Sequence, residues 1–181
     1  MARIIAVTNQ KGGVGKTTTC VNLAAALAET RRRVLLIDFD PQGHATMGSG
    51  ISKKEAKPSG CEVLLQEVPF EQAIRKVEAG YDLLPANGDL TAAEVRLMPA
   101  PGREMRLKQL LAPLRSKYHY VLIDCPPSLG VLTLNALTAA DSVLIPMQCE
   151  FYALDGLTAL MDTVKAVKAS VNPALQIEGL L

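Results

Sequence analysis

The sequence lacks tryptophan and is poor in aromatic residues, which make up 4% of its 181 positions. Bases of single-stranded nucleic acids are commonly stacked on aromatic side chains, so this mode of recognition is disfavoured. An excess of one charge is also missing, because 19 lysines and arginines nearly balance 18 aspartates and glutamates. A net charge of +1 gives no global basic field. Any DNA contact must therefore be a local patch, and it would be nonspecific and sensitive to salt.

Long hydrophobic runs are absent as well. No apolar run approaches the roughly 20 residues needed to cross a bilayer. The stretch from Met1 to Thr8 is too short for the apolar region of a signal peptide and has no small-residue cleavage site. The four cysteines, at positions 20, 61, 125 and 149, form no C-x-x-C pair and have no histidine at metal-ligand spacing. We expect reduced thiols in a soluble, cytoplasmic protein.

Short apolar runs alternate with helical patterns along the chain. The runs cover residues 4–7, 34–37, 121–123 and 143–145, and they are typical of strands buried on both faces. Helical spacing is found from Lys16 to Glu29, from Arg103 to Lys117, and in the stripe Leu154, Leu157, Met161, Val164, Val167 and Val171. The alternation predicts an α/β fold with a mostly parallel, twisted sheet and helices on both faces.

Two segments are harder to assign. Residues from Ser52 to Pro101 are the least regular, and Tyr81–Pro85 is the only convincing strand among them. Ile177–Leu181 resembles the start of another strand, so either this strand lies at a sheet edge or the chain is truncated there. With 49% hydrophobic residues the chain can bury a sizeable core, and we expect residues 1–181 to form a single domain.

A glycine-rich turn links the first predicted strand to the first helix. Its end, Gly15-Lys16-Thr17, matches the phosphate-loop pattern G-x-x-x-x-G-K-[ST], although Gln10 replaces the first glycine. Backbone N–H groups of such a loop surround phosphate oxygens, and the helix adds its positive N-terminal end. The predicted loop consists of Lys11, Gly12, Gly13, Val14, Gly15, Lys16, Thr17 and Thr18. It predicts binding of ATP or ADP, rather than an empty strand-to-helix turn.

Each polar group of the loop has an expected task. The ammonium of Lys16 would lie on the β- and γ-phosphates, and the hydroxyl of Thr17 would coordinate Mg²⁺. Asp124, at the end of a predicted strand, is expected to hold the metal through water. Asp38 and Asp40 follow another strand, and we expect Asp38 in the metal shell and Asp40 on the attacking water. Asp38 could instead cap the following turn.

Five segments resemble the ParA/Soj family of DNA-partitioning ATPases, in the ParA/MinD superfamily. Lys11–Thr18 resembles the deviant Walker A motif, whose signature is the early lysine. Asp38–Gly43 is similar to switch I, and Asp124–Ser128 followed by Leu132–Asn135 to switch II. Gln148–Leu154 is similar to a later segment. The resemblance implies a P-loop NTPase fold and a Mg²⁺-dependent ATPase that hydrolyses ATP to ADP and phosphate.

The resemblance also implies partners. In the family the signature lysine, here Lys11, reaches the phosphates of a second subunit, so catalysis would use Lys11, Lys16 and Asp40 in an ATP-dependent homodimer. A ParB-type partner, nonspecific DNA and a nucleoid location are expected, and no membrane. Relatives continue beyond Leu181, so the domain is expected to lack their C-terminal portion, which supplies adenine and DNA contacts. His44 stands where the family commonly has asparagine and is interpreted as a tolerated variant.

Several alternatives remain open at this point. A MinD-like ATPase acting at membrane surfaces is the first, and a metabolic enzyme on the same fold, such as an iron protein or an amide-forming synthetase, is the second. A nucleotide-gated scaffold without catalysis is the third. Two basic groups are candidates for DNA contact, Lys165 with Lys168 and the run Arg31–Arg33.

Overall fold

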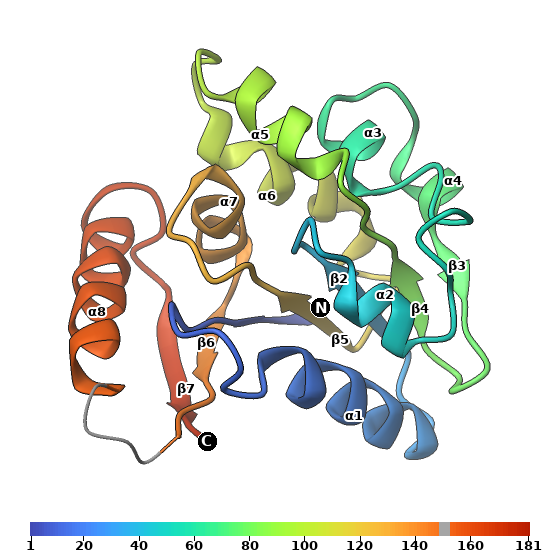
Figure 1. The fold of residues 1–181 in the computed structure, drawn as a ribbon, viewed down its shortest axis with the longest axis horizontal. Helices are drawn as coiled ribbons and strands as arrows, with labels where there is room; N and C mark the ends of the chain where they lie inside the picture. Colours follow the sequence, from blue (N-terminus) through green and yellow to red (C-terminus); the bar gives the residue numbers. More distant parts are fainter. Residues whose placement is uncertain (149–152) are drawn as a thin grey trace.

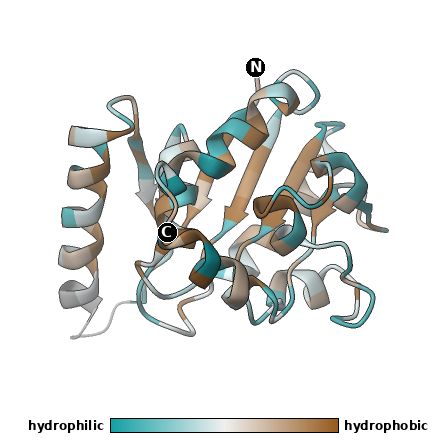
Figure 2. Ribbon diagram, turned by 90° about the horizontal axis from the view of Figure 1, so that it is seen from above, coloured by the Kyte–Doolittle hydropathy of each residue, from teal (hydrophilic) through white to brown (hydrophobic). Residues whose placement is uncertain are grey.

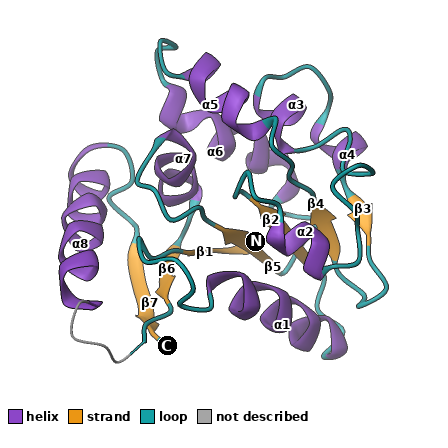
Figure 3. Cartoon of the chain, in the orientation of Figure 1, coloured by secondary structure: helices purple, strands orange, loops and turns teal. Residues whose placement is uncertain are grey.

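A computed structural model describes residues 1–148 and 153–181, with the backbone alone at 153–155. One seven-stranded sheet runs through the described residues in the order β3-β4-β2-β5-β1-β6-β7 (Figures 1 and 3). All neighbouring strands pair in parallel except β3 and β4. The strands are β1 (Arg3–Val7), β2 (Val34–Asp38), β3 (Arg75–Lys76), β4 (Asp82–Leu84), β5 (Tyr120–Asp124), β6 (Ser142–Ile145) and β7 (Gln176–Leu180). The mostly parallel sheet is confirmed.

Helices cover both faces of the sheet, as predicted. They are α1 (Lys16–Glu29), α2 (His44–Gly48), α3 (Gly60–Leu64), α4 (Phe70–Ala73), α5 (Leu90–Leu97), α6 (Arg106–Leu111), α7 (Val131–Ala139) and α8 (Ala153–Ser170), with 3-10 turns η1 (Arg103–Met105) and η2 (Ala112–Leu114). In Figure 1, α1 lies below the sheet, and α5, α6 and α7 lie above it. No helix in the described part of the chain is long and apolar enough to cross a membrane.

The strands fill two cores because successive side chains point to opposite faces. On β2, Val34 and Leu36 pack in the core between the sheet and α1 with α2. Leu35 and Ile37 pack in the core on the other face, which is shared by α3 to α8. All four of these side chains are at most 2% exposed. This explains the continuous apolar runs in the sequence and the hydrophobic colour of the central strands in Figure 2.

Two sequence expectations are corrected by the structure. The segment from Ser52 to Pro101 contains β4, as predicted, but also α3, α4, α5 and β3, whose lengths of 2 to 8 residues are too short for periodicity to show. A serine–glutamate capping box at Ser59 and Glu62 starts α3, and this pair is the sequence signal that indicates the start of the helix. The helix expected from Arg103 to Lys117 is broken into η1, α6 and η2, with Pro113 inside η2.

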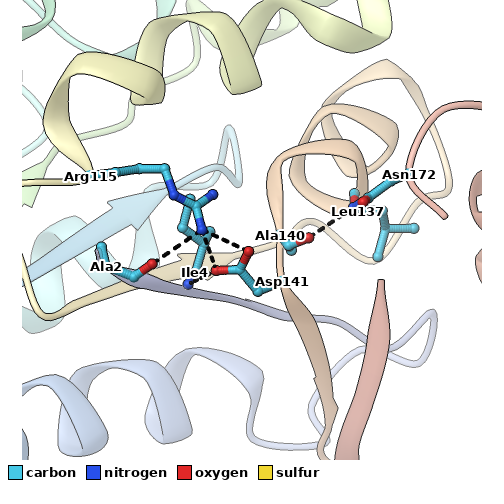
Figure 4. Close-up of polar contacts among 7 residues, drawn as sticks. All are labelled: Ala2, Ile4, Arg115, Leu137, Ala140, Asp141 and Asn172. Atoms are coloured by element: carbon cyan, nitrogen blue, oxygen red, sulfur yellow. Dashed lines mark hydrogen bonds and ion pairs between the residues drawn. The ribbon is translucent and has the colours of Figure 1, made fainter. Parts of the chain in front are cut away.

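A polar network holds one end of the sheet (Figure 4). This end lies opposite the strand ends that carry Asp38 and Asp124. The Arg115 side chain donates from Nη2 to both carboxylate oxygens of Asp141, at 2.7 and 2.8 Å, and to the carbonyl of Ala2 at 3.2 Å. Asp141 also accepts from the backbone N–H of Ile4 at 2.8 Å. Asn172 donates to two carbonyls at the C-terminal end of α7, at 2.8 and 2.9 Å. The bonds of Asp141 fix β1 and Arg115 relative to the start of β6, and those of Asn172 fix α7 to the turn between α8 and β7.

A second polar anchor is Asn135, a residue of the predicted switch II segment. The side chain is fully buried on α7; its Oδ1 accepts from the backbone N–H of Leu107 at 3.0 Å, and its Nδ2 donates to the carbonyls of Arg103 and Val131, both at 2.9 Å. Asn135 therefore ties η1 and α6 to α7.

Replacing Asn135 with alanine is expected to destabilise the chain by about 2–3 kcal/mol, because a buried N–H and a buried carbonyl lose their partner. Urea unfolding monitored by circular dichroism measures this change. Asn22→Ala is the matched control, since Asn22 is exposed and bonds only within its own helix. Equal midpoints for the two variants would contradict this role of Asn135.

Candidate nucleotide site

The candidate site lies where β1, β2 and β5 end. Parallel pairing places Asp38 directly opposite Asp124, and Val7 opposite Asp124 on the other side. The glycine-rich loop follows β1 and leads into α1, as predicted. Gly13 and Gly15 have φ values of +74° and +92°, conformations that other residues rarely adopt, and Gly15 is the N-cap of α1. The glycines thus turn the loop over the N-terminus of α1.

Asn9 holds the start of the loop and was not predicted. Its side chain, 4% exposed, donates from Nδ2 to the carbonyl of Pro146 at 2.8 Å and accepts from the backbone N–H of Lys11 at 3.0 Å. Gln148 donates from Nε2 to the carbonyl of Gly13 at 3.3 Å. The rest of the family-like segment that begins at Gln148 includes residues 149–152, which lie outside the described residues. The loop is therefore fixed to the end of β6.

A pocket of about 600 Å³ opens above the loop, a size suited to a nucleotide. It is lined by Gly12, Gly13, Gly15, Lys16, Thr17, Thr18, Asp40, Pro41, Gln42, His44, Thr91 and Pro127. Most of the predicted loop and Asp40 are thus brought together. Lys11 and Val14 of the loop do not line the pocket, and Val14, Asp38 and Asp124 are buried. Pro127 belongs to the predicted switch II segment after β5, whereas Thr91 comes from α5 and no sequence signal marked it.

Lys16 lies almost buried within the site. Its side chain belongs to a residue 8% exposed, and its Nζ donates to the carbonyl of Lys11 at 3.0 Å. Burial lowers the pKa of this ammonium, and the carboxylates of Asp124 and Asp40 oppose the shift. Among the described residues, no carboxylate forms an ion pair with this ammonium, which donates to the loop carbonyl, so Lys16 is available to a phosphate.

Thr17 and Asp124 form the part of the site that fits a metal ion. The Thr17 hydroxyl donates to Oδ2 of Asp124 at 2.7 Å, and Oδ1 of Asp124 is buried without a hydrogen-bond partner. Such an orphaned carboxylate oxygen next to a hydroxyl is a donor set that Mg²⁺ or its water ligands can satisfy. The residues present therefore fit the predicted metal.

Asp38 and Asp40 have different surroundings. The fully buried Asp38 accepts at Oδ2 from both the backbone N–H and the hydroxyl of Thr46, at 2.7 Å each, and at Oδ1 from the N–H of Asp40 at 3.2 Å. Asp40 is half-buried and lines the pocket. In this structure Asp38 fastens α2 to β2, and Asp40 is the carboxylate that reaches the cavity.

The turn between Asp40 and α2 depends on Gly43. Its φ is +64°, and a Cβ at this position would lie 2.8 Å from the carbonyl oxygen of Ala86. A left-handed conformation and a close approach to backbone both require glycine. Gly43 thus explains the glycine of the switch I pattern, and it places His44 at the pocket.

Burial changes the acidity of the two buried aspartates. It raises the pKa of Asp124 to about 7 and that of Asp38 to about 6, although hydrogen bonds from Thr17 and Thr46 act in the opposite direction. An acid whose folded pKa is raised binds its proton more tightly when folded. Its contribution to stability is therefore present below its unfolded pKa, near 4, and is lost as the pH rises to about 7.

Asp124→Asn is expected to remove the larger part of this pH dependence. Without nucleotide or metal, the variant should gain on the order of 2 kcal/mol relative to the unsubstituted chain between about pH 5 and pH 8, because asparagine carries no buried charge. Urea unfolding at the two pH values measures the difference, and titrations common to both proteins cancel. A constant difference would show that Asp124 does not titrate in this range.

Comparisons with known proteins agree with this geometry. A family model described as an AAA domain matches residues 2–177. The sporulation initiation inhibitor protein Soj of Bacillus subtilis (strain 168) is 51% identical over 182 residues, covering 100% of this chain and 72% of Soj. The chromosome partitioning protein ParA of Caulobacter vibrioides is 50% identical, covering 99% of this chain and 68% of ParA.

Solved structures match as closely. The crystal structure of cobyrinic acid a,c-diamide synthase from Mycobacterium smegmatis, with bound ADP and magnesium, has a TM-score of 0.97 and 49% identity, covering 100% of this chain and 74% of that one. A second structure of the same protein holds an ATP analogue and magnesium. The P-loop NTPase fold is confirmed by these neighbours, and the ligands bound in them agree with the expected cofactors, ATP or ADP with Mg²⁺.

The two curated relatives are identical to this chain at about half of the aligned positions, and the alignments cover more than two thirds of their own length. Residues of the glycine-rich loop, of the switch I segment and of the segment Asp124–Ser128 line one pocket. The chain therefore belongs to the ParA/Soj family of DNA-partitioning ATPases.

Proposed function

We propose that this chain hydrolyses ATP in the pocket above the glycine-rich loop and uses the reaction as a switch in DNA partitioning. The observation that supports hydrolysis is the convergence of a buried cation, a hydroxyl–carboxylate pair and a second carboxylate. Lys16, Thr17 with Asp124, and Asp40 all lie at this one pocket or directly beneath it. Such a set can both neutralise phosphate charge and orient a nucleophile.

Each group has a distinct part in the proposed reaction. The loop N–H groups and Lys16 bind the phosphates and stabilise charge that develops on the γ-phosphate. Thr17 and Asp124 would hold Mg²⁺, which would neutralise phosphate charge when bound. Asp40 accepts a hydrogen bond from the attacking water and orients it in line with the phosphorus. Asp38 would support the metal shell, and through Thr46 it holds α2 in place.

The partitioning role draws on the relatives named Soj and ParA. In the proposal, residues 1–181 act as one ATPase domain that dimerises with ATP, binds DNA nonspecifically on the nucleoid and responds to a ParB-type partner. Lys11 supplies charge to the phosphates of the second subunit, in the manner of an arginine finger. Hydrolysis then removes the group that bridges the subunits.

Sedimentation with ATP and Mg²⁺ tests the dimer. The unsubstituted chain is expected to dimerise with ATP and to be monomeric with ADP, and Lys11→Ala is expected to bind ATP as a monomer. Lys168→Ala, an exposed lysine of α8, serves as the control that should still dimerise. ATP-dependent dimers of Lys11→Ala would remove Lys11 from the interface.

An amide-forming synthetase is a second candidate, because a neighbour at 49% identity is named cobyrinic acid a,c-diamide synthase. The two functions differ in what ATP turnover requires. A partitioning ATPase releases phosphate without a small-molecule acceptor, whereas a synthetase consumes ATP only with its acid and an amine donor. Phosphate release that starts only when cobyrinic acid and an amine donor are added would replace the proposed role.

A further inference from the structure

Positive charge gathers in a second hollow, at the end of the sheet opposite the nucleotide pocket. This basic hollow, of about 390 Å³, is lined by Arg32, Arg33, Val34, Lys76, Gly80, Asp82, Lys117 and Tyr118. Val34 and Asp82 are the first residues of β2 and β4, whereas Asp38 ends β2 beside the nucleotide site. The two hollows therefore lie at opposite ends of the same parallel strands.

The backbone around the hollow holds the arginines in place. Arg31 has a φ of +62°, which turns the chain sharply after α1. The backbone N–H of Arg33 donates to Nδ1 of His119 at 2.9 Å, and its carbonyl accepts from the N–H of His119 at 2.8 Å. This pair of bonds ties the arginine run to the segment that enters β5. The backbone of the arginine run is therefore held in place at the edge of the hollow.

The charges of the hollow are not balanced within the chain. In residues 1–148 and 153–181, no ion pair involves the side chain of Arg32, Arg33 or Lys76. Lys117 pairs with Glu71 at 3.0 Å, outside the residues that line the hollow. Asp82, the single acid in the lining, accepts from the hydroxyl of Tyr118 at 2.8 Å. Three cations thus converge without a partner, which favours an anionic ligand.

We propose that the basic hollow binds phosphate groups of the duplex DNA backbone. This inference rests on the proposed partitioning function and adds to it a place where the DNA is held. Arginine presents planar N–H forks that match phosphate oxygens, and three cations can neutralise two or three phosphates. The one aromatic ring of the lining, Tyr118, is 8% exposed, so bases cannot stack on it. Binding is therefore to the backbone and independent of sequence.

The other basic candidate, on α8, is less suited to this task. Lys165 and Lys168 are exposed, and Lys165 lies 3.6 Å from Asp162 on its own helix. They line neither the nucleotide pocket nor the basic hollow. In Figure 1, α8 and β7 lie at the opposite side of the molecule from β3 and β4. The two basic groups can therefore be tested independently.

Fluorescence anisotropy with a mixed-sequence duplex, in the presence of ATP and Mg²⁺, tests the proposal. The variant carries Arg32→Gln, Arg33→Gln and Lys76→Gln, all exposed positions, and the control carries Lys54→Gln, Lys165→Gln and Lys168→Gln. Near 100 mM salt the dissociation constant of the first variant should rise on the order of tenfold, and the slope of log affinity against log salt should fall by about 2–3. The control should bind as the unsubstituted chain does.

Each other outcome overturns the proposal. Equal affinity of the first variant and the unsubstituted chain removes the hollow from DNA binding, and equal weakening of both variants indicates net charge alone. No duplex binding by the unsubstituted chain also overturns it. ATP hydrolysis measured in the same samples distinguishes a failure of DNA binding from a failure of the proposed ATPase function. The unsubstituted chain could instead bind phosphatidylserine vesicles and not DNA. If only the first variant loses this vesicle binding, the hollow is assigned to a membrane.

Discussion

A Lys16→Ala chain is expected to lose ATP affinity by at least about 100-fold, which corresponds to roughly 2.7 kcal/mol. The ammonium is nearly buried, its Nζ donates to the carbonyl of Lys11 at 3.0 Å, and no carboxylate in the part of the chain that the structure describes pairs with it. A charge-assisted bond to phosphate in such a place is strong because little water competes for it. Alanine leaves the phosphates facing Asp40 and Asp124 without this cation, so repulsion adds to the loss.

Titration of a fluorescent ATP analogue in the presence of Mg²⁺ measures the effect. Lys165→Ala is the matched control, because this lysine is exposed on α8 and far from the pocket lining. Far-ultraviolet circular dichroism of both variants verifies that they fold. Retained nucleotide binding by folded Lys16→Ala would mean that the phosphates do not lie on the glycine-rich loop.

Asp40→Ala is expected to bind ATP within about threefold of the unsubstituted chain, yet to hydrolyse it about 100- to 1,000-fold more slowly. Asp40 lines the pocket with its carboxylate, while its Oδ1 accepts from the N–H of Gln42 at 2.9 Å. The loss should therefore appear in the chemical step rather than in binding. ATP-bound dimers should accumulate as a result.

Single-turnover phosphate release and sedimentation with ATP measure both consequences. Asp162→Ala, an acid on the surface of α8, controls for the loss of a negative charge. Asp40→Asn adds a sharper comparison, since it keeps the size and one acceptor oxygen but cannot take a proton. Hydrolysis by Asp40→Ala at the normal rate would transfer the water-orienting role to another carboxylate, with Asp38 the nearest in sequence.

Much of the fold could be predicted because its strands are buried on both faces. Runs such as Ile4–Val7 and Val34–Ile37 have no polar residue to confuse their assignment, and both lie in the centre of the sheet. The edge strand β7 was anticipated from Ile177–Leu181. The short helices α3 and α4 could not be found in this way, because one turn of helix carries no repeat. Their positions depend on capping and on tertiary contacts instead.

The residues of the site also fall into those that the sequence could predict and those that it could not. Lys16, Thr17 and Asp40 could be predicted because a phosphate loop and its acids follow strand ends, which parallel pairing brings to one edge. Asn9 and Thr91 could not, because their roles depend on contacts with Pro146 and on the position of α5. Asp38 shows a limit of another kind. The sequence leaves two roles open for it, in the metal shell or capping the following turn, and in this structure both of its oxygens accept hydrogen bonds from the protein.

The most direct test of an ATP switch at this pocket is phosphate release by the unsubstituted chain, with and without nonspecific DNA, from about 50 to 200 mM salt. We predict slow release that requires Mg²⁺, rises with DNA, loses the DNA effect as salt increases, and is absent in Lys16→Ala. Release that persists in Lys16→Ala, or that continues when Mg²⁺ is chelated, would contradict the assignment of the loop from Lys11 to Thr18 as the site of ATP hydrolysis.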